Sequence, residues 1–557
     1  MSNASVKKVN SGFGKRLLPG IAAAFTAAFL LFVYAPMELY LTNQLEFWFT
    51  AGQLLPYALA LCALCVILLV LVLALAGKLG EKLYTACLAL GFLAIVCTWI
   101  QGSYLVRGLP AMNGAVVDWG AHTGARLASV LLWILAAAAV ILALRLLGPA
   151  RFRTVVGFGS LAICLLLAVT LAGLALTTER AEKGRALACT DEGMFTYSED
   201  ENLLILVLDA VDGVAFEQVL DRDPAYPAVF DDFTYFRNTV GGYPYSKCSI
   251  PLIITGEWYE AKQGFVEFER AALASSPVVR RVEDEGWRRF LYPNDPYIMS
   301  AVEAGQFENL TPDQPAFRSF GSAAKILVKM TLVKHAPWDL KRFGYDLPFR
   351  LTEAMRYSGQ EGVSYYNWSD PVFYGAVRDN NPITKVPDKV WKYLHLEGAH
   401  EPHVYDKDLN VLESSPFRDV IEGNITMLSS FLQRMKEAGV YDNTVIVLCS
   451  DHGSHNTTDL VTINQHPILL IKGKNEHHPF RMDDAPISFD DLQTAYLRLL
   501  DGAQSDEVFD WQAGDARERR FFDYEMVNSN VLTEYVQTGH AEDMESLLPT
   551  GRIFEYK

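Results

Sequence analysis

Charged side chains are scarce in this 557-residue chain: 20% of its residues are Asp, Glu, Lys or Arg, whereas 50% are hydrophobic. Basic residues are short above all after residue 180, where 36 Lys and Arg stand against 60 Asp and Glu. Before that point the balance reverses, with 12 basic and 5 acidic residues. Nucleic-acid phosphates need a basic surface. The acidic C-terminal part therefore excludes nucleic acid as its partner.

Cysteines are too few and too unevenly placed for a disulfide framework. Five of the eight lie in apolar runs, where they are expected to act as small core residues. Only Cys189, Cys248 and Cys449 lie elsewhere, which is an odd number. One bridge could form among these three, but the sequence does not favour it.

Long apolar runs are present instead, at about 17–34, 54–76, 83–100, 127–147 and 155–176. Each is close to the ~20 residues that a helix needs to cross a bilayer. A single run of this kind could be a buried core helix, and the first could be a signal peptide. Five in succession, with no clear small-residue cleavage site after the first, favour a transmembrane domain over residues 1–176.

Basic residues predict the orientation of these spans, because Lys and Arg concentrate on the inner side of a membrane. They cluster before the first run, between the second and third, and between the fourth and fifth. The alternate loops, at about 43–53 and 101–124, are poor in Lys and Arg. The sequence therefore predicts a multi-pass cell-membrane protein whose chain after residue 176 is extracytoplasmic. A transporter is disfavoured, because the spans carry almost no charge.

The pattern changes after a polar segment at 177–200, which we interpret as a linker. Short apolar runs at 203–208, 391–396, 445–449 and 467–472 are typical of strands buried on both faces. A helical pattern at 421–439 lies between two of them. We therefore expect an α/β domain over 201–557, with a mainly parallel sheet sandwiched by helices and a small subdomain after about 502.

Three candidate metal ligands follow two of these strands: Asp209, Asp451 and His452. Ligands in open α/β folds bind beyond the carboxyl ends of the strands. Carboxylate oxygens with an imidazole suit one divalent metal, Zn²⁺ or Mn²⁺. A single Asp after a strand is often only a helix cap, whereas the Asp-His pair is more specific. Ser246, at the start of a predicted helix, is either an ordinary N-cap or a nucleophile activated by that metal.

Four motifs in order resemble the alkaline phosphatase/sulfatase superfamily: NLLILVLDA (202–210), SKCSIPLIITG (246–256), LEGAHEPH (396–403) and VIVLCSDHG (445–453). With five preceding spans, the chain is similar to lipoteichoic acid synthases and lipid A phosphoethanolamine transferases. The resemblance implies that Asp209, Ser246, Asp451 and His452 bind the catalytic metal. It also implies that Ser246 replaces the family's Thr nucleophile, and it favours Ser246 over Ser249.

Histidines complete the set that the resemblance implies. His400 matches a residue that contacts the substrate phosphate or protonates a leaving group. A second substrate-binding histidine is expected after the Asp-His pair, at either His455 or His466, of which we favour His466. The pattern departs from true sulfatases, because no Arg follows Pro251 and no second Asp follows Asp209.

These features together predict an enzyme that transfers phosphoglycerol or phosphoethanolamine from a phospholipid donor. The acceptor is expected to be an envelope glycan, lipid or polymer, and the intermediate a phosphoserine. Two alternatives stay open. One is a membrane-bound sulfatase or phosphodiesterase that transfers to water. The other is a non-catalytic lipid-binding regulator on the same scaffold.

Overall fold

The computed structural model describes residues 17–44, 47–106, 109, 117, 119–178, 187–294, 298, 301–313, 315–345, 351–357, 363–379, 381–454, 459–524 and 531–555. The chain divides into two compact units. A helical unit comprises residues 1–181 and 315–358, and an α/β unit comprises 182–314 and 359–557. The second unit is thus not the continuous domain 201–557 that the sequence suggests, because 315–358 packs with the N-terminal helices.

Long apolar helices make up most of the helical unit. Four are long and apolar enough to cross a membrane among the described residues: Leu17–Thr42, α3 (Ala51–Leu79), α4 (Glu81–Tyr104) and α5 (Thr123–Thr177). The first contains a π-helical turn, η1 (Leu30–Tyr34), followed by α2 (Ala35–Thr42). All five predicted runs lie in these helices.

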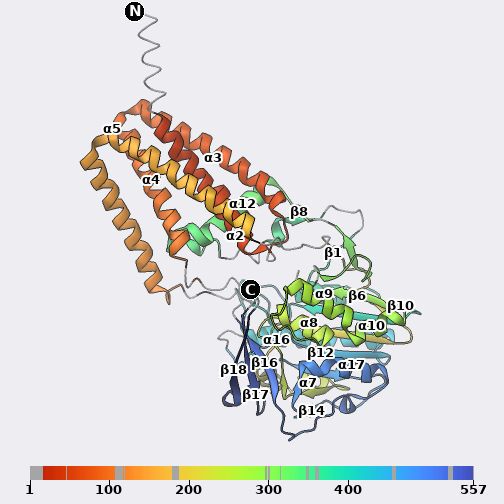
Figure 1. Cartoon of the computed structure of the whole chain (residues 1–557). Coiled ribbons are helices and arrows are strands. Elements are labelled where there is room, and N and C mark those ends of the chain that lie inside the picture. The colour runs from red at the N-terminus through yellow and green to blue at the C-terminus, as the bar shows by residue number, and fades with distance from the viewer. Residues whose placement is uncertain are drawn as a thin grey trace, which may run out of the picture. The chain divides into compact units, whose positions relative to one another are not determined.

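The longest of these helices, α5, holds two of the predicted spans. Its backbone leaves the helical conformation at Gly148 (φ 71°, ψ 161°), directly before Pro149. Glycine tolerates this positive φ, and proline cannot continue the hydrogen-bond ladder of a helix. Figure 1 shows the two arms of α5 folded back on each other at this break. The arms correspond to the predicted spans 127–147 and 155–176.

The remainder of the helical unit comes from later in the chain. It consists of β8 (Ala316–Phe317), α12 (Phe320–His335), α13 (Trp338–Lys341), η3 (Thr352–Ala354) and β9 (Met355–Arg356). Strands β8 and β9 pair with each other in antiparallel orientation. Ile326, Leu327 and Met330 of α12 are buried in one apolar cluster with Leu54 and Ala58 of α3.

A seven-stranded sheet forms the centre of the α/β unit, in the order β14-β4-β13-β12-β3-β11-β6. The strands are β3 (Asn202–Leu208), β4 (Thr234–Phe236), β6 (Arg288–Tyr292), β11 (Val390–Leu396), β12 (Thr444–Cys449), β13 (Leu469–Lys472) and β14 (Arg481–Asp483). Strands β12, β3, β11 and β6 are parallel neighbours, and β13 runs antiparallel to both of its neighbours. The four strands that the sequence predicts are β3, β11, β12 and β13.

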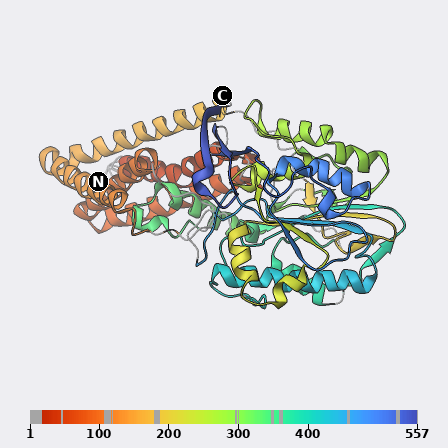
Figure 2. The ribbon, with the colours of Figure 1, turned by 90° about the horizontal axis from the view of Figure 1, so that it is seen from below.

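Helices cover both faces of this sheet (Figure 2). One layer contains α6 (Gly213–Leu220), α7 (Ala225–Val229), α15 (Asp370–Arg378) and α16 (Phe417–Ala438). The other contains α8 (Ser246–Thr255), α9 (Phe265–Ser275), α10 (Pro277–Asp284) and α17 (Leu492–Leu500). Because both faces are covered, every residue of β3, β11 and β12 is buried.

Smaller elements surround the main sheet. An antiparallel sheet of β16 (Arg519–Asp523), β17 (Val531–Gln537) and β18 (Leu547–Glu555) lies in the stretch after residue 502, and it belongs to the same compact unit as the main sheet. Further short strands are β1 (Leu187–Cys189) with β7 (Leu310–Pro312), β2 (Thr196–Ser198) with β10 (Thr384–Val386), and β5 (Thr239–Val240) with β15 (Ile487–Ser488). Single turns of 3-10 helix are η4 (Phe489–Asp491), η5 (Ser505–Glu507) and η7 (Met544–Ser546). Since β1 and β2 lie within 177–200, the predicted linker is partly structured.

Candidate metal centre and nucleophile

The carboxyl ends of two adjacent parallel strands carry the first candidate ligands. Asp209 directly follows β3, and Asp451 and His452 follow β12, which pairs with β3 up to Cys449 and Val207. One oxygen of Asp451, Oδ1, accepts hydrogen bonds from the backbone N–H groups of Ala210 (3.1 Å) and His452 (3.0 Å). These bonds hold the Asp451 carboxylate across the two strand ends, with its second oxygen directed toward Asp209 and His452.

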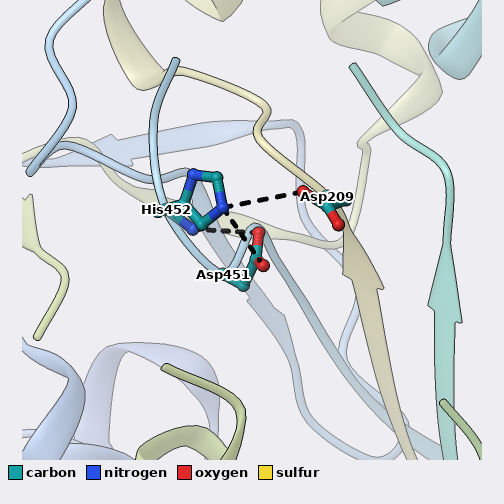
Figure 3. Close-up of side chains that lie close together, drawn as sticks. All are labelled: Asp209, Asp451 and His452. Carbon is teal, nitrogen blue, oxygen red and sulfur yellow. Dashed lines mark hydrogen bonds and ion pairs between the residues drawn. The ribbon is translucent and has the colours of Figure 1, made fainter. Parts of the chain in front are cut away.

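Asp209, Asp451 and His452 form the one cluster among the described residues that could hold a metal ion (Figure 3). His452 Nε2 lies 3.7 Å from Asp209 Oδ1 and 3.5 Å from Asp451 Oδ2. All three side chains are buried. Asp209 Oδ1 and Asp451 Oδ2, the two carboxylate oxygens that face His452, have no hydrogen-bond partner. Two unpaired carboxylate oxygens without a compensating charge are costly to bury. A divalent cation between these atoms would satisfy both.

The orientation of His452 fits the same interpretation. Its Nδ1 lies 2.7 Å from the Gly453 carbonyl oxygen, which can only accept, so Nδ1 carries the proton. Nε2 then faces the two carboxylates, on the side of the ring where a metal-ligating imidazole binds its ion. The donor set of two carboxylates and one imidazole suits Zn²⁺ or Mn²⁺. The residues present therefore fit one divalent metal.

Two further residues, which the sequence analysis did not identify, hold the other oxygen of Asp209. Asn294 follows β6 and donates from Nδ2 to Asp209 Oδ2 at 2.6 Å. His395, fully buried in β11, has Nε2 3.5 Å from the same oxygen and Nδ1 3.2 Å from the Tyr393 hydroxyl. The sequence held one signal for His395, because His395 and Lys392 are charged-type side chains in a strand that is otherwise apolar or aromatic.

The charge state of Asp209 follows from these neighbours. Burial by itself would raise the pKa of this carboxyl group. The imidazoles of His400, His395 and His452 outweigh that effect and hold the pKa below its ordinary value. Asp209 is therefore a carboxylate at neutral pH, as a metal ligand must be.

Ser246 lies beside this cluster. It is the first residue of α8, and its Oγ is 3.5 Å from both Asp209 Oδ2 and His452 Nε2. The N-terminal end of a helix favours an anion through its unpaired N–H groups and its dipole. Ser249, the alternative nucleophile, is fully buried and donates its hydroxyl to the Tyr243 carbonyl at 3.2 Å. The geometry thus favours Ser246 as the nucleophile.

His400 is positioned by a loop that lies against Asp209. The Ala399 N–H donates to the Asp209 carbonyl at 2.7 Å, and the Asp209 N–H donates to Leu396 at 3.2 Å. Gly398 makes the turn with φ +60°, and a Cβ there would lie 2.4 Å from the Asp209 nitrogen. His400 itself is half-buried, with Nδ1 2.6 Å from the Glu401 carbonyl and its ring 5.6 Å from that of Trp368.

The second substrate-binding histidine stays a prediction. His466 is fully buried, its Nε2 lies 2.7 Å from the Arg237 carbonyl, and its ring packs against Gly213. Burial lowers its pKa to about 4, so it is neutral at physiological pH. These contacts show that His466 is part of the packed interior, and they do not support a role in substrate binding. The other candidate, His455, lies outside the described residues.

Comparison with known proteins gives matches among solved structures only. No family model matches the chain, and no curated protein matches it. A protein in the alkaline phosphatase superfamily from Vibrio parahaemolyticus is 13% identical, with a TM-score of 0.37, over 66% of this chain and 80% of its own. Lipoteichoic acid synthase LtaP from Listeria monocytogenes is 13% identical, with a TM-score of 0.36, over 65% and 88%. Phosphonate monoester hydrolase from Silicibacter pomeroyi is 15% identical, with a TM-score of 0.35, over 64% and 89%.

The first of these proteins is described by the name of the superfamily that the four motifs resemble. The chain is similar to these proteins, but identities and TM-scores this low do not allow residue roles to be transferred from them to this chain. The chemistry of the site depends on the residues of this chain.

Proposed function

We propose that this protein is a metal-dependent enzyme that transfers a phospho-headgroup, phosphoglycerol or phosphoethanolamine, from a phospholipid to an acceptor in the cell envelope. One observation carries the proposal. The Ser246 hydroxyl lies 3.5 Å from both Asp209 and His452, beside two buried carboxylate oxygens that have no hydrogen-bond partner. A hydroxyl, two carboxyl groups and an imidazole around one point are the parts of a metal-activated nucleophile.

The metal would be held by Asp209, Asp451, His452 and the Ser246 oxygen. When bound, it supplies positive charge that lowers the pKa of a nearby hydroxyl and stabilises charge on phosphate oxygens. The protein's own contribution is to fix these side chains before substrate arrives. Asp451 Oδ1 is held by two backbone N–H groups, and Asp209 Oδ2 is held by Asn294.

The reaction we propose has two half-reactions. First, Ser246 Oγ, whose proton has gone to solvent, bonds to the phosphorus as the bond from phosphorus to the diacylglycerol oxygen breaks. His400 gives that leaving oxygen a proton. Then the acceptor hydroxyl attacks the phosphoserine, His400 takes the acceptor's proton back, and the Ser246 oxygen leaves phosphorus. The Glu401 carbonyl, 2.6 Å from His400 Nδ1, orients the ring for both transfers.

The apolar helices give the proposal its location. A phospholipid donor stays in the bilayer, so an enzyme that uses it must work close to the membrane surface. We infer a multi-pass cell-membrane protein with its α/β unit outside. This is supported by the distribution of basic residues along the helices.

Mass spectrometry of the full-length protein tests the proposed intermediate. After incubation with phosphatidylglycerol or phosphatidylethanolamine and the metal, we expect the matching phospho-headgroup on the peptide that contains Ser246. S246A should carry no adduct yet keep its metal, because Asp209, Asp451 and His452 remain. S249A is the matched control and should still form the adduct.

The same experiment separates the alternatives. An adduct that persists in S246A, or that is lost only in S249A, contradicts the assignment of the nucleophile. If the adduct decays at the same rate with and without acceptor, releasing the free headgroup, the enzyme is a phosphodiesterase rather than a transferase. A wild-type protein that binds metal but never forms an adduct contradicts the covalent mechanism.

A further inference from the structure

Residues 315–345 and 351–357 pack with the N-terminal helices, although the 133 residues Glu182–Gln314 of the α/β unit separate the two in sequence. Their apolar face is buried against α3, and polar contacts add to this. Thr331 Oγ1 donates to the Leu31 carbonyl at 2.5 Å, and Lys334 Nζ lies 2.5 Å from Glu38 Oε1. Such half-buried polar contacts specify one position for α12 on the bundle.

Apart from the contact with Leu31, near the middle of its helix, these contacts lie at one end of the bundle. Gln53, at the start of α3, donates to the Pro315 carbonyl (2.9 Å), and Ser129, near the start of α5, accepts from the Trp338 N–H (3.1 Å). The opposite end holds the break at Gly148 and the ion pair of Arg153 with Glu81 (2.6 Å). Figure 1 shows α12 among the helix ends farthest from the break in α5. This is the end that the basic residues predict to be outside.

The remaining face of this segment is exposed and amphipathic. Its large apolar side chains are Phe320, Val328, Leu340 and Phe343, which are 47%, 42%, 45% and 57% exposed. Arg318, Lys325 and Arg342 are exposed on the same segment. The ion pair of Lys325 with Glu353 is weak, because it spans 3.9 Å between exposed side chains.

The charge of this segment is opposite to that of its surroundings in sequence. Residues 315–345 contain six Lys and Arg and one Asp, whereas the chain after residue 180 is strongly acidic overall. Helices that lie in a membrane surface combine apolar residues with Lys and Arg, because the former enter the acyl boundary and the latter bind lipid phosphates. The exposed face of α12 and α13 has this composition.

We propose that α12 and α13 form an interfacial element that lies in the outer surface of the bilayer and binds anionic phospholipid headgroups. Phe320, Val328, Leu340 and Phe343 contact acyl chains, and Arg318, Lys325 and Arg342 bind lipid phosphates. This inference rests on the membrane placement in the proposed function, not on its chemistry.

Photocrosslinking of the full-length protein in phosphatidylglycerol-containing vesicles tests the apolar contact. Position 328 is replaced by the photoreactive residue p-benzoylphenylalanine, with two controls of similar exposure: Leu71 on α3 (60%) and Val372 on α15 (51%). We expect lipid adducts from positions 71 and 328 and none from 372. Adducts from 71 but not 328 overturn the interfacial element alone. No adducts from 71 overturn the membrane placement and the inference with it.

Titration with short-chain lipids tests the charge. Full-length protein in neutral detergent should bind dihexanoyl phosphatidylglycerol more tightly than dihexanoyl phosphatidylcholine. The variant R318Q/K325Q/R342Q should lose this preference by about tenfold or more, since each basic residue near a lipid surface contributes several-fold. The control R378Q/K385Q/K407Q removes three exposed basic residues of the α/β unit. The proposal is overturned if the wild type binds the two lipids with equal affinity. It is also overturned if both triple variants lose the preference for phosphatidylglycerol to the same extent.

Discussion

At the scale of single residues, the two carboxylate oxygens of Asp209 have different surroundings. Its Oδ2 is held by Asn294 and approached by His395, while its Oδ1 lies 3.7 Å from His452 with no hydrogen-bond partner. Residues that fix a ligand in this way orient it for the metal and so contribute to metal affinity. His395 is therefore a positioning residue for the metal centre.

We expect H395A to weaken metal binding by about 10–100-fold, because Asp209 loses a partner that orients it. Competition with a chelator of known affinity measures the effect in the full-length protein. H466A is the matched control, since His466 is also fully buried but contacts the Arg237 carbonyl instead. H466A should lower stability and leave metal affinity unchanged. Equal losses of affinity in both variants would show that burial alone explains the effect of H395A.

The sequence indicates some of these residues and not others, for a physical reason. Asp209, Asp451 and His452 follow strands with unbroken apolar runs, so their place at the edge of the sheet follows from the pattern. His395 reaches Asp209 because β11 pairs with β3 so that His395 lies opposite Val207. Asn294 follows β6, whose sequence RRFLY has two Arg and an apolar run of only three residues. Neither contact can be predicted before strand order and register are known.

At the scale of elements, the loop after β11 depends on one glycine. Gly398 has φ +60° and lies directly against the backbone of Asp209. Another glycine with a positive φ has no such close neighbour. Gly439, after α16, has φ +65°, and nothing lies within 4 Å of the position of its Cβ. The two glycines therefore separate the effect of conformation from that of a close approach.

G439A should cost only the strain of a positive φ, roughly 1–2 kcal/mol of unfolding free energy. G398A adds a collision with the Asp209 backbone and should cost more, with loss of bound metal. Denaturant unfolding and metal analysis of the two variants test this. If G398A keeps its metal and is no less stable than G439A, the loop does not position Asp209.

The elements that sequence patterns predict are the long and strongly apolar ones. The five apolar runs and strands β3, β11, β12 and β13 were predicted, and each is confirmed as a helix or strand. Strands β4 and β14 have only three residues each, and β14 is largely exposed, so no periodicity distinguishes them from loops. The antiparallel orientation of β13 also escapes prediction, because buried parallel and antiparallel strands share the same apolar composition.

At the scale of the whole molecule, the membrane orientation is the proposal with the widest consequences. Residues near the break between α3 and α4 should be inside, and the α/β unit should be outside. We expect a membrane-impermeant maleimide to label V411C on intact cells and to label L79C only after permeabilisation. The two native side chains have the same exposure, 71%. The unsubstituted chain gives the background of its native cysteines, and the reverse labelling pattern would put the catalytic site in the cytoplasm.

Residues 315–358 belong to the helical unit although they lie within the sequence of the α/β unit. This determines which fragments of the protein can be obtained in soluble form. A fragment cut at residue 187 would keep α12 but lose the helices that cover Ile326, Leu327 and Met330. Those side chains would then face solvent, and such a fragment should aggregate or need detergent. A tractable water-soluble version needs a second excision, with 315–358 replaced by a flexible glycine-serine bridge. The obvious single truncation therefore gives a misleading sample for metal or substrate binding.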